Sequence, residues 1–181
     1  MFHCQFCGYV ASKLYSHIPA LSAFILKMGY THYWYKNYDA ETAVFEAKYA
    51  ELLPIVEKIV QIAGVELEGN VSSEYIQLNG IDSDGHETFV WLPGKAVGGF
   101  NMLMNMGEDE DEQGDNPPKF SQGVFACCKT ARKEYDIVVV AILCAIQHIY
   151  GEELVKVSSD GDMVSDWAAG REIYETAVEV K

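Results

Sequence analysis

The sequence is short of positive charge. Its 181 residues include 13 Lys or Arg against 27 Asp or Glu, a formal net charge of −14 at pH 7 with histidine neutral. A surface this acidic repels phosphate backbones, so general nucleic-acid binding is not expected. The same charge suits either a solvated acidic coat or the attraction of a basic protein partner.

The sequence also lacks a long apolar run. The longest, residues 137–146, is well short of the ~20 residues that a bilayer-spanning helix needs. The earlier apolar stretch, residues 14–26, contains His17 and Pro19 and has no small-residue cleavage signature. We therefore expect neither a transmembrane helix nor a signal peptide, and no membrane partner.

Cysteines that could form a disulfide framework are missing too. The five cysteines are an odd number, Cys127 and Cys128 are adjacent and cannot readily pair, and Cys144 lies within an apolar run. A disulfide scaffold is therefore not expected, and the pattern favours a reducing, cytoplasmic location.

Apolar and aromatic residues are abundant, at 49% and 12% of the chain, which is enough for one sizeable core. Residues 29–36 are aromatic and β-branched, which predicts a strand. Residues 74–80 and 86–92 flank an Asp-Gly turn, which predicts a hairpin. A short strand is expected over residues 154–158.

Three helices are expected between and after these strands. The first begins near a capping Asp39 and ends at Gly64, with a kink or a break into two short helices at Pro54. Its apolar face recurs at three- and four-residue steps: Phe45, Tyr49, Leu52, Val56, Ile59 and Ala63. Residues 135–150 are apolar nearly all round, which predicts a central buried helix, and residues 166–178 predict an amphipathic one.

This order of elements predicts a single α+β domain. We expect a small antiparallel or mixed sheet packed by the central buried helix and flanking helices. Residues 93–120, with the acidic run 108–112, have little periodicity and are expected to form a long loop, which is typical of a lid, a binding loop or a mobile insertion.

Residues 1–27 differ in character from the rest of the chain. Cys4, Cys7 and His17 are arranged like the first half of a zinc finger, but His17 comes too early and the next histidine is His32. We therefore expect residues 1–27 to be an N-terminal extension, followed by the domain over residues 28–181. Zinc ligation by the extension is the alternative.

Residues 28–34 read Met-Gly-Tyr-Thr-His-Tyr-Trp. This heptapeptide resembles the opening of a family of uncharacterised proteins from phage and bacterial genomes. Residues 86–89, 128–130, 135–136 and 158–161 also resemble that family, whereas Glu134 stands where its members have proline. The family has no known function, so the resemblance supports the limits of the domain and implies no activity.

Two histidines are candidate ligand-binding residues. His32 lies among aromatic residues of the first strand, where histidine is either a hydrogen-bonded structural residue or a ligand. His86 is next to Glu87, but neighbouring strand residues point to opposite faces, so the two are not expected to act on one substrate atom.

The densest basic patch precedes the buried helix and contains Lys129, Thr130, Arg132 and Lys133. Cationic side chains at a helix start predict an anion or phosphate site, and a solvated first turn is the alternative. Neither standard nucleotide-binding loop is present. Cys128 would be a nucleophile if the positive field lowered its pKa, and inert if it were buried.

A polar turn at residues 158–162 follows a strand. Its Ser159 and Asp160 are candidate ligand-binding residues, and the carboxylates of Asp160 and Asp162 could share a hard cation. The same residues are typical of a turn and a helix cap, and we assign no metal.

Two functions remain open from the sequence. In the first, the basic turn, the polar turn and His32 or His86 converge on a small anionic ligand, phosphorylated or nucleotide-like. In the second, the protein is an acidic protein-interaction module without enzymatic activity, a phage-type accessory or host-modulating protein. The sequence identifies no cofactor and does not decide whether the protein is an enzyme.

Overall fold

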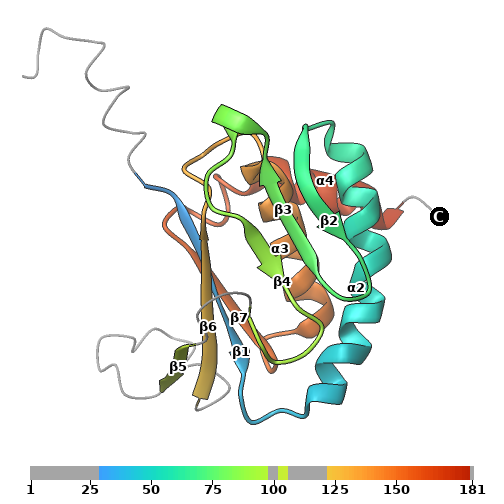
Figure 1. The fold of residues 1–181 in the computed structure, drawn as a ribbon, viewed down its shortest axis with the longest axis vertical. Helices are drawn as coiled ribbons and strands as arrows, with labels where there is room; N and C mark the ends of the chain where they lie inside the picture. The colour runs from blue at the N-terminus through green and yellow to red at the C-terminus, as the bar shows by residue number, and fades with distance from the viewer. Residues whose placement is uncertain (1–28, 98–101, 106–121, 180–181) are drawn as a thin grey trace, which may run out of the picture.

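The computed structural model describes residues 29–97, 102–105 and 122–179, which form an α+β fold with two antiparallel sheets (Figure 1). The larger sheet has the order β5-β6-β1-β7: β5 (Met102–Asn105), β6 (Gln122–Lys129), β1 (Thr31–Asn37) and β7 (Val155–Ser159). The smaller has the order β2-β3-β4: β2 (Leu67–Val71), β3 (Ile76–Gly80) and β4 (Phe89–Trp91). The predicted fold class is confirmed.

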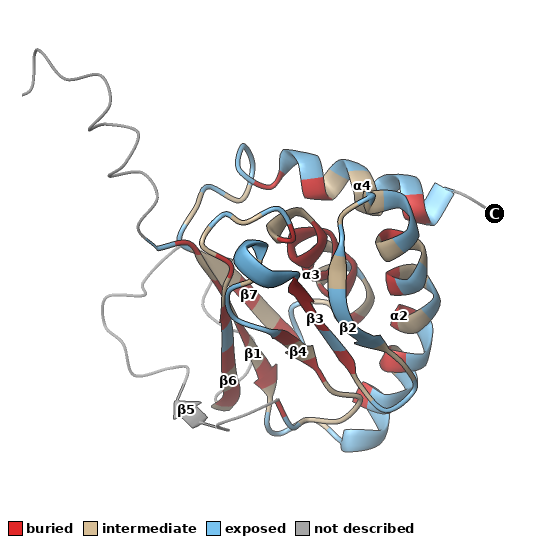
Figure 2. Ribbon diagram, turned by 45° about the horizontal axis from the view of Figure 1, so that its top comes forward, coloured by how far each residue is buried: buried red, intermediate tan, exposed pale blue. Residues whose placement is uncertain are grey.

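Three helices pack around this framework: α2 (Thr42–Ala63), α3 (Asp136–Tyr150) and α4 (Ala168–Glu179). Helix α3 is buried along most of its length, and it packs against α2, α4 and β7. Figure 2 shows it largely red at the centre, with α2 and α4 outside it. The central buried helix is thus confirmed. No helix in the described ranges is both long and apolar enough to cross a membrane.

Helix α2 differs from its prediction in two ways. It runs unbroken from Thr42 to Ala63 with Pro54 inside it, so it is not two short helices. Glu41 rather than Asp39 occupies the cap position, and no side chain caps the helix. Asp39 lies in the preceding bend, where its N–H donates to Asn37 Oδ1 at 2.9 Å. The end at Gly64, with φ 65°, is as expected.

Three strands were not predicted. Strand β2 places exposed Glu68, Gly69 and Asn70 between half-buried ends, so it lacks apolar alternation. Strand β6 is rich in small residues, and β5 falls inside the predicted long loop. The predicted hairpin is confirmed as β3 and β4, joined through a 3-10 turn at Asp82–Asp84. The acidic run 108–112 and the extension 1–27 lie outside the described residues.

Strand β1 positions the candidate site. Its residues alternate between faces, and His32, Trp34 and Lys36 point into the core, as does Tyr30 just before the strand. It pairs with β6 on one side and β7 on the other, and His32 lies opposite both Cys128 and Ser159. The turns that follow β6 and β7 therefore meet at the start of β1.

Lys36 on the same face ties the loop after β4 to the sheet. Its buried Nζ donates to the carbonyl oxygens of Leu92, Gly94 and Ala96 at 2.8, 2.8 and 3.1 Å, and lies 4.0 Å from the Trp91 ring centroid. Burial lowers the pKa of Lys36 to about 7. The three acceptors oppose this, because only the ammonium form has three N–H donors. Lys36 is therefore held as an ammonium ion.

Candidate functional site

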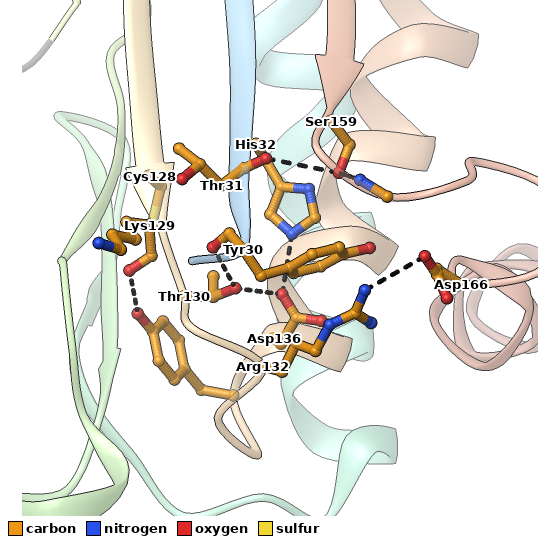
Figure 3. Close-up of polar contacts among 12 residues, drawn as sticks. Tyr30, Thr31, His32, Cys128, Lys129, Thr130, Arg132, Asp136, Ser159 and Asp166 are labelled. Carbon is orange, nitrogen blue, oxygen red and sulfur yellow. Dashed lines mark hydrogen bonds and ion pairs between the residues drawn. The ribbon is translucent and has the colours of Figure 1, made fainter. Parts of the chain in front are cut away.

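A polar cluster lies where β1 begins, between the turns that follow β6 and β7 (Figure 3). We call it the His32 cluster and define it by seven residues drawn from the start of β1, both turns and the first residue of α3: Tyr30, His32, Thr130, Arg132, Asp136, Asp166 and Trp167. Three of them, Thr130, Arg132 and His32, belong to the residues predicted from the sequence.

A hydrogen-bond network orients the imidazole of His32. Its Nε2 lies 2.8 Å from Asp136 Oδ1, and the Thr130 hydroxyl donates to the same oxygen. Asp136 is the first residue of α3, where the helix dipole favours a carboxylate. Because an ionised carboxylate only accepts hydrogen bonds, Nε2 carries the proton. Nδ1 makes no hydrogen bond, and in the tautomer with its only proton on Nε2 it is an acceptor.

A tight turn places Arg132 over the cluster. Ala131 and Arg132 have φ values of 52° and 55°, a left-handed conformation that costs free energy in residues other than glycine. The backbone N–H groups of Thr130 and Ala131 hold it by donating to Tyr30 O at 3.0 and 3.1 Å. The Arg132 Cζ atom consequently stacks 3.9 Å from the centroid of the Tyr30 ring.

Arg132 is only loosely paired. Its guanidinium lies 3.4 Å from Asp166 Oδ2, and its side chain is 46% exposed. The same carboxylate oxygen accepts the backbone N–H of Asp162 at 3.0 Å. An exposed pair at this distance is weak, so Arg132 can exchange Asp166 for another anionic partner at little cost.

Buried polar atoms without partners lie beneath this arginine. His32 Nδ1 and Trp167 Nε1 make no hydrogen bond, and Tyr30 Oη has only the nearby Ser159 hydroxyl, which is too poorly placed for a regular one, although all three residues are at most 2% exposed. The His32 ring centroid lies 5.0 Å from that of Tyr30 and 5.5 Å from that of Trp167. A fourth such atom in the described residues, Trp34 Nε1, lies further along β1. Unpaired buried polar groups are costly, and three together indicate a missing partner.

The tyrosine hydroxyl in this group remains a donor. Burial raises the pKa of Tyr30, and the nearby Ser159 hydroxyl lowers it in part. The phenol is therefore neutral at physiological pH. Figure 3 shows the hydroxyl end of Tyr30 and the free edge of the imidazole on the side where Ser159 and Asp166 lie.

The turn after β7 closes the other side of the cluster. Asp160 accepts the Thr31 N–H at 2.9 Å and the Tyr33 hydroxyl at 2.7 Å, so it fastens the turn to β1. Asp162 accepts the N–H groups of Val164 and Ser165, and these bonds lower its pKa. The two carboxylates therefore serve separate backbone donors, as turn and cap residues do. No group of three His, Cys, Asp or Glu within the described chain is arranged to hold a metal ion.

The other predicted residues lie elsewhere. Lys129 lies on the opposite side of Thr130 from Arg132 (Figure 3), and its backbone N–H donates to Glu87 Oε2 at 2.7 Å. Lys133 Nζ donates to Ser83 O at 2.7 Å, and His86 is exposed in the connection between β3 and β4. The basic patch is thus split, and only Arg132 among its cations faces the cluster. The role of these residues in ligand binding stays a prediction.

Cys128 is not a nucleophile in this arrangement. Its thiol is fully buried and lies 3.3 Å from Glu87 O, to which it donates. Burial, with Glu87 nearby, raises its pKa to about 12. The thiolate that a nucleophile requires is therefore suppressed.

A groove of about 520 Å³ lies between α3 and α4 and shares Trp167 with the cluster; it is also lined by Cys144, His148, Arg171 and Tyr174. The Arg171 guanidinium already donates to Met163 O at 2.7 Å. Burial raises the pKa of Cys144, so this thiol is not activated either. The groove therefore has the size of a ligand site, and its charged lining residues are Arg171, already engaged with Met163 O, and the exposed Glu175.

No family model, curated protein or solved structure matches this chain. The function is therefore argued from the geometry of the site.

Proposed function

We propose that the protein binds a small oxyanion in the His32 cluster. The observation that carries the proposal is the set of three unpaired, buried polar atoms beneath a loosely paired arginine. A guanidinium with free donors is well suited to a planar or tetrahedral oxyanion. Nearby hydroxyl and indole donors would complete the coordination.

The binding step is an exchange of partners. Arg132 leaves Asp166 Oδ2, to which it is held at 3.4 Å, and pairs with the incoming anion. The hydroxyl of Tyr30 and the N–H of Trp167 donate to the anion's oxygens. Because these groups are already buried and unpaired, they gain hydrogen bonds without losing bonds to protein or bulk water.

The surrounding carboxylates limit which anions enter. Asp136, Asp160 and Asp162 are each occupied by at least two hydrogen-bond donors, which offsets part of their charge. Asp166 keeps one donor, the N–H of Asp162, after Arg132 leaves. The residual negative field disfavours large polyanions and leaves a site for one small group.

The test is calorimetric titration of inorganic phosphate into the full chain and two single variants. Arg132→Ala should weaken binding at least about tenfold, since a charge-assisted bond is lost. Lys129→Ala is the matched control, because it removes a neighbouring cation that does not face the cluster, and it should bind as the wild type does. The double variant should bind no more weakly than Arg132→Ala does, with its fold intact by circular dichroism. Equal affinity in Arg132→Ala and the wild type would contradict the proposal.

A second candidate function rests on the opposite face of the larger sheet. Tyr33, Tyr35 and Phe125 are half-buried there. The ring centroid of Phe125 lies 6.3 Å from that of Tyr33 and 5.2 Å from that of Tyr35. Aromatic side chains of this kind are enriched in protein interfaces. This face therefore favours the second candidate, an acidic protein-interaction module. The resemblance to phage and bacterial proteins implies that such a module would be an accessory or host-modulating protein.

Photo-cross-linking from the exposed Cys127 tests this second candidate. Cys127 lies on β6 opposite Tyr33 of β1. A defined partner that cross-links to the wild type and is lost in Phe125→Asp, a variant that still binds phosphate, would support it. No cross-linked partner in the wild type, or one unaffected by Phe125→Asp, would count against it.

A further inference from the structure

We infer that the ligand of the His32 cluster is an oxyanion that keeps a proton, with hydrogen phosphate as the species bound. This inference rests on the proposed function and specifies its ligand. It follows from the hydrogen-bonding character of the groups that face the unpaired space, which are not all donors.

The donors are Arg132, Tyr30 and Trp167. A guanidinium and an indole N–H only donate, and the neutral Tyr30 hydroxyl is able to donate. Together they match several acceptor oxygens on one small group. These three donors alone would bind any tetrahedral oxyanion, sulfate included.

His32 changes this selection. Asp136 Oδ1 fixes the ring proton on Nε2 at 2.8 Å, and the Thr130 hydroxyl holds the carboxylate in place. Nδ1 therefore presents a lone pair, buried and without a partner. A fully deprotonated oxyanion would set an oxygen lone pair against it and leave both unpaired. An anion with one O–H group would donate that hydrogen to Nδ1.

Asp166 acts in the same direction. Once Arg132 turns to the ligand, the Asp166 carboxylate remains at the mouth of the cluster as an acceptor with a negative charge. It repels an anion without a proton and accepts a hydrogen bond from one that carries an O–H. Specificity against the wrong anion thus comes from unpaired acceptors as well as from attraction.

The turn after β7 packs closely against one side of the cluster. A Cβ added at Gly161 would lie 2.4 Å from Tyr30 Cε2, 2.6 Å from Tyr30 Oη and 2.5 Å from Asp166 Oδ2. The turn after β7 therefore lies directly against the hydroxyl that would meet the ligand.

Four tetrahedral anions separate protonation from shape and charge. At about pH 7.5, phosphate and arsenate keep one proton, whereas sulfate has none. Methyl phosphate is a monoester with a second pKa near 6, so at this pH almost all of it has lost its last proton as well. Calorimetry on the full chain should show phosphate and arsenate binding, with sulfate and methyl phosphate at least about tenfold weaker.

The outcomes distinguish the two proposals. Sulfate or methyl phosphate binding as tightly as phosphate would overturn this inference and leave the proposed oxyanion site standing, provided that Arg132→Ala still weakens binding. Absence of binding by all four anions, or binding that Arg132→Ala does not change, would overturn both.

A second measurement needs no substitution and so cannot fail through misfolding. Long-range nitrogen–proton NMR spectra report which ring nitrogen of each histidine carries a proton. His32 should show a protonated Nε2 and a bare Nδ1, and phosphate should shift the Nδ1 signal while sulfate leaves it unchanged. Exposed His148 is the internal control and should not respond. A proton on Nδ1 of His32 in the free protein would overturn the inference.

Discussion

At the scale of single residues, the buried face of β1 is unusual because two of its three inward side chains carry ionisable groups. Lys36 finds three carbonyl oxygens and His32 finds Asp136 and, through it, Thr130. Each of these polar groups is hydrogen-bonded to residues far away in the sequence. Lys36 is satisfied completely, whereas His32 keeps one free nitrogen, and that difference separates a structural residue from a candidate site residue.

Lys36→Met should destabilise the protein by about 2–4 kcal/mol. The substitution removes the ammonium ion and leaves the carbonyl groups of Leu92, Gly94 and Ala96 without donors, and unpaired buried acceptors are costly. Chemical denaturation measures the change in the free energy of unfolding. Lys48→Met, at a partly exposed surface position where the ammonium group pairs with Glu51, is the control and should change it by less than about 0.5 kcal/mol. A Lys36→Met protein as stable as the wild type would show that the carbonyl groups are satisfied in another way.

Cys127 and Cys128 should react differently with iodoacetamide although they are neighbours. Cys127 is exposed, whereas Cys128 is buried with its pKa raised to about 12. Peptide mapping after alkylation of the native protein near about pH 8 should show Cys127 modified at least about tenfold faster. In denaturant the two rates should converge. Equal rates in the native protein would mean that Cys128 is accessible.

At the scale of elements, the close crossing of α3 and α4 depends on a residue without a side chain. A Cβ at Gly170 would lie 2.5 Å from Val140 Cγ1 and 2.7 Å from Val140 Cβ. Helix α4 begins directly after Asp166 and Trp167, so its position against α3 also sets one wall of the His32 cluster.

Gly170→Ala should therefore destabilise the protein by about 1–3 kcal/mol, because the added methyl group overpacks the contact between the helices. Alanine favours a helix by about 1 kcal/mol over glycine, so helix propensity alone predicts the opposite sign. Thermal and denaturant unfolding decide between them. Ala169→Gly at an exposed position of α4 is the control for propensity. A more stable Gly170→Ala variant would rule out the steric account.

At the scale of the whole molecule, the sequence was informative about elements with clear periodicity. The apolar steps of α2, the uniformly apolar α3, the aromatic β1 and the Asp-Gly hairpin were all predicted from local pattern. Strand β6 was not, because its small residues and cysteines carry little strand signal. Its pairing with β1 brings residues 130–132 beside Tyr30 and His32.

The candidate site was therefore predicted only in part. His32, Thr130 and Arg132 stand out in the sequence as a ring-flanked histidine and a local basic patch. Tyr30, Asp136, Asp166 and Trp167 do not, because their importance depends on which turns flank β1. The sequence also predicted Lys129, Lys133 and His86 as site residues, but the fold places them elsewhere. The Lys129 backbone N–H donates to Glu87, the Lys133 side chain donates to Ser83 O, and His86 is exposed between β3 and β4.

A crystal structure of the full chain with phosphate at saturating concentration tests the central claim most directly. We predict a phosphate within hydrogen-bond distance of the Arg132 guanidinium, Tyr30 Oη and His32 Nδ1, with the Arg132–Asp166 pair broken. The account would be contradicted if Arg132 remained on Asp166 and ordered water alone satisfied the tyrosine and the histidine.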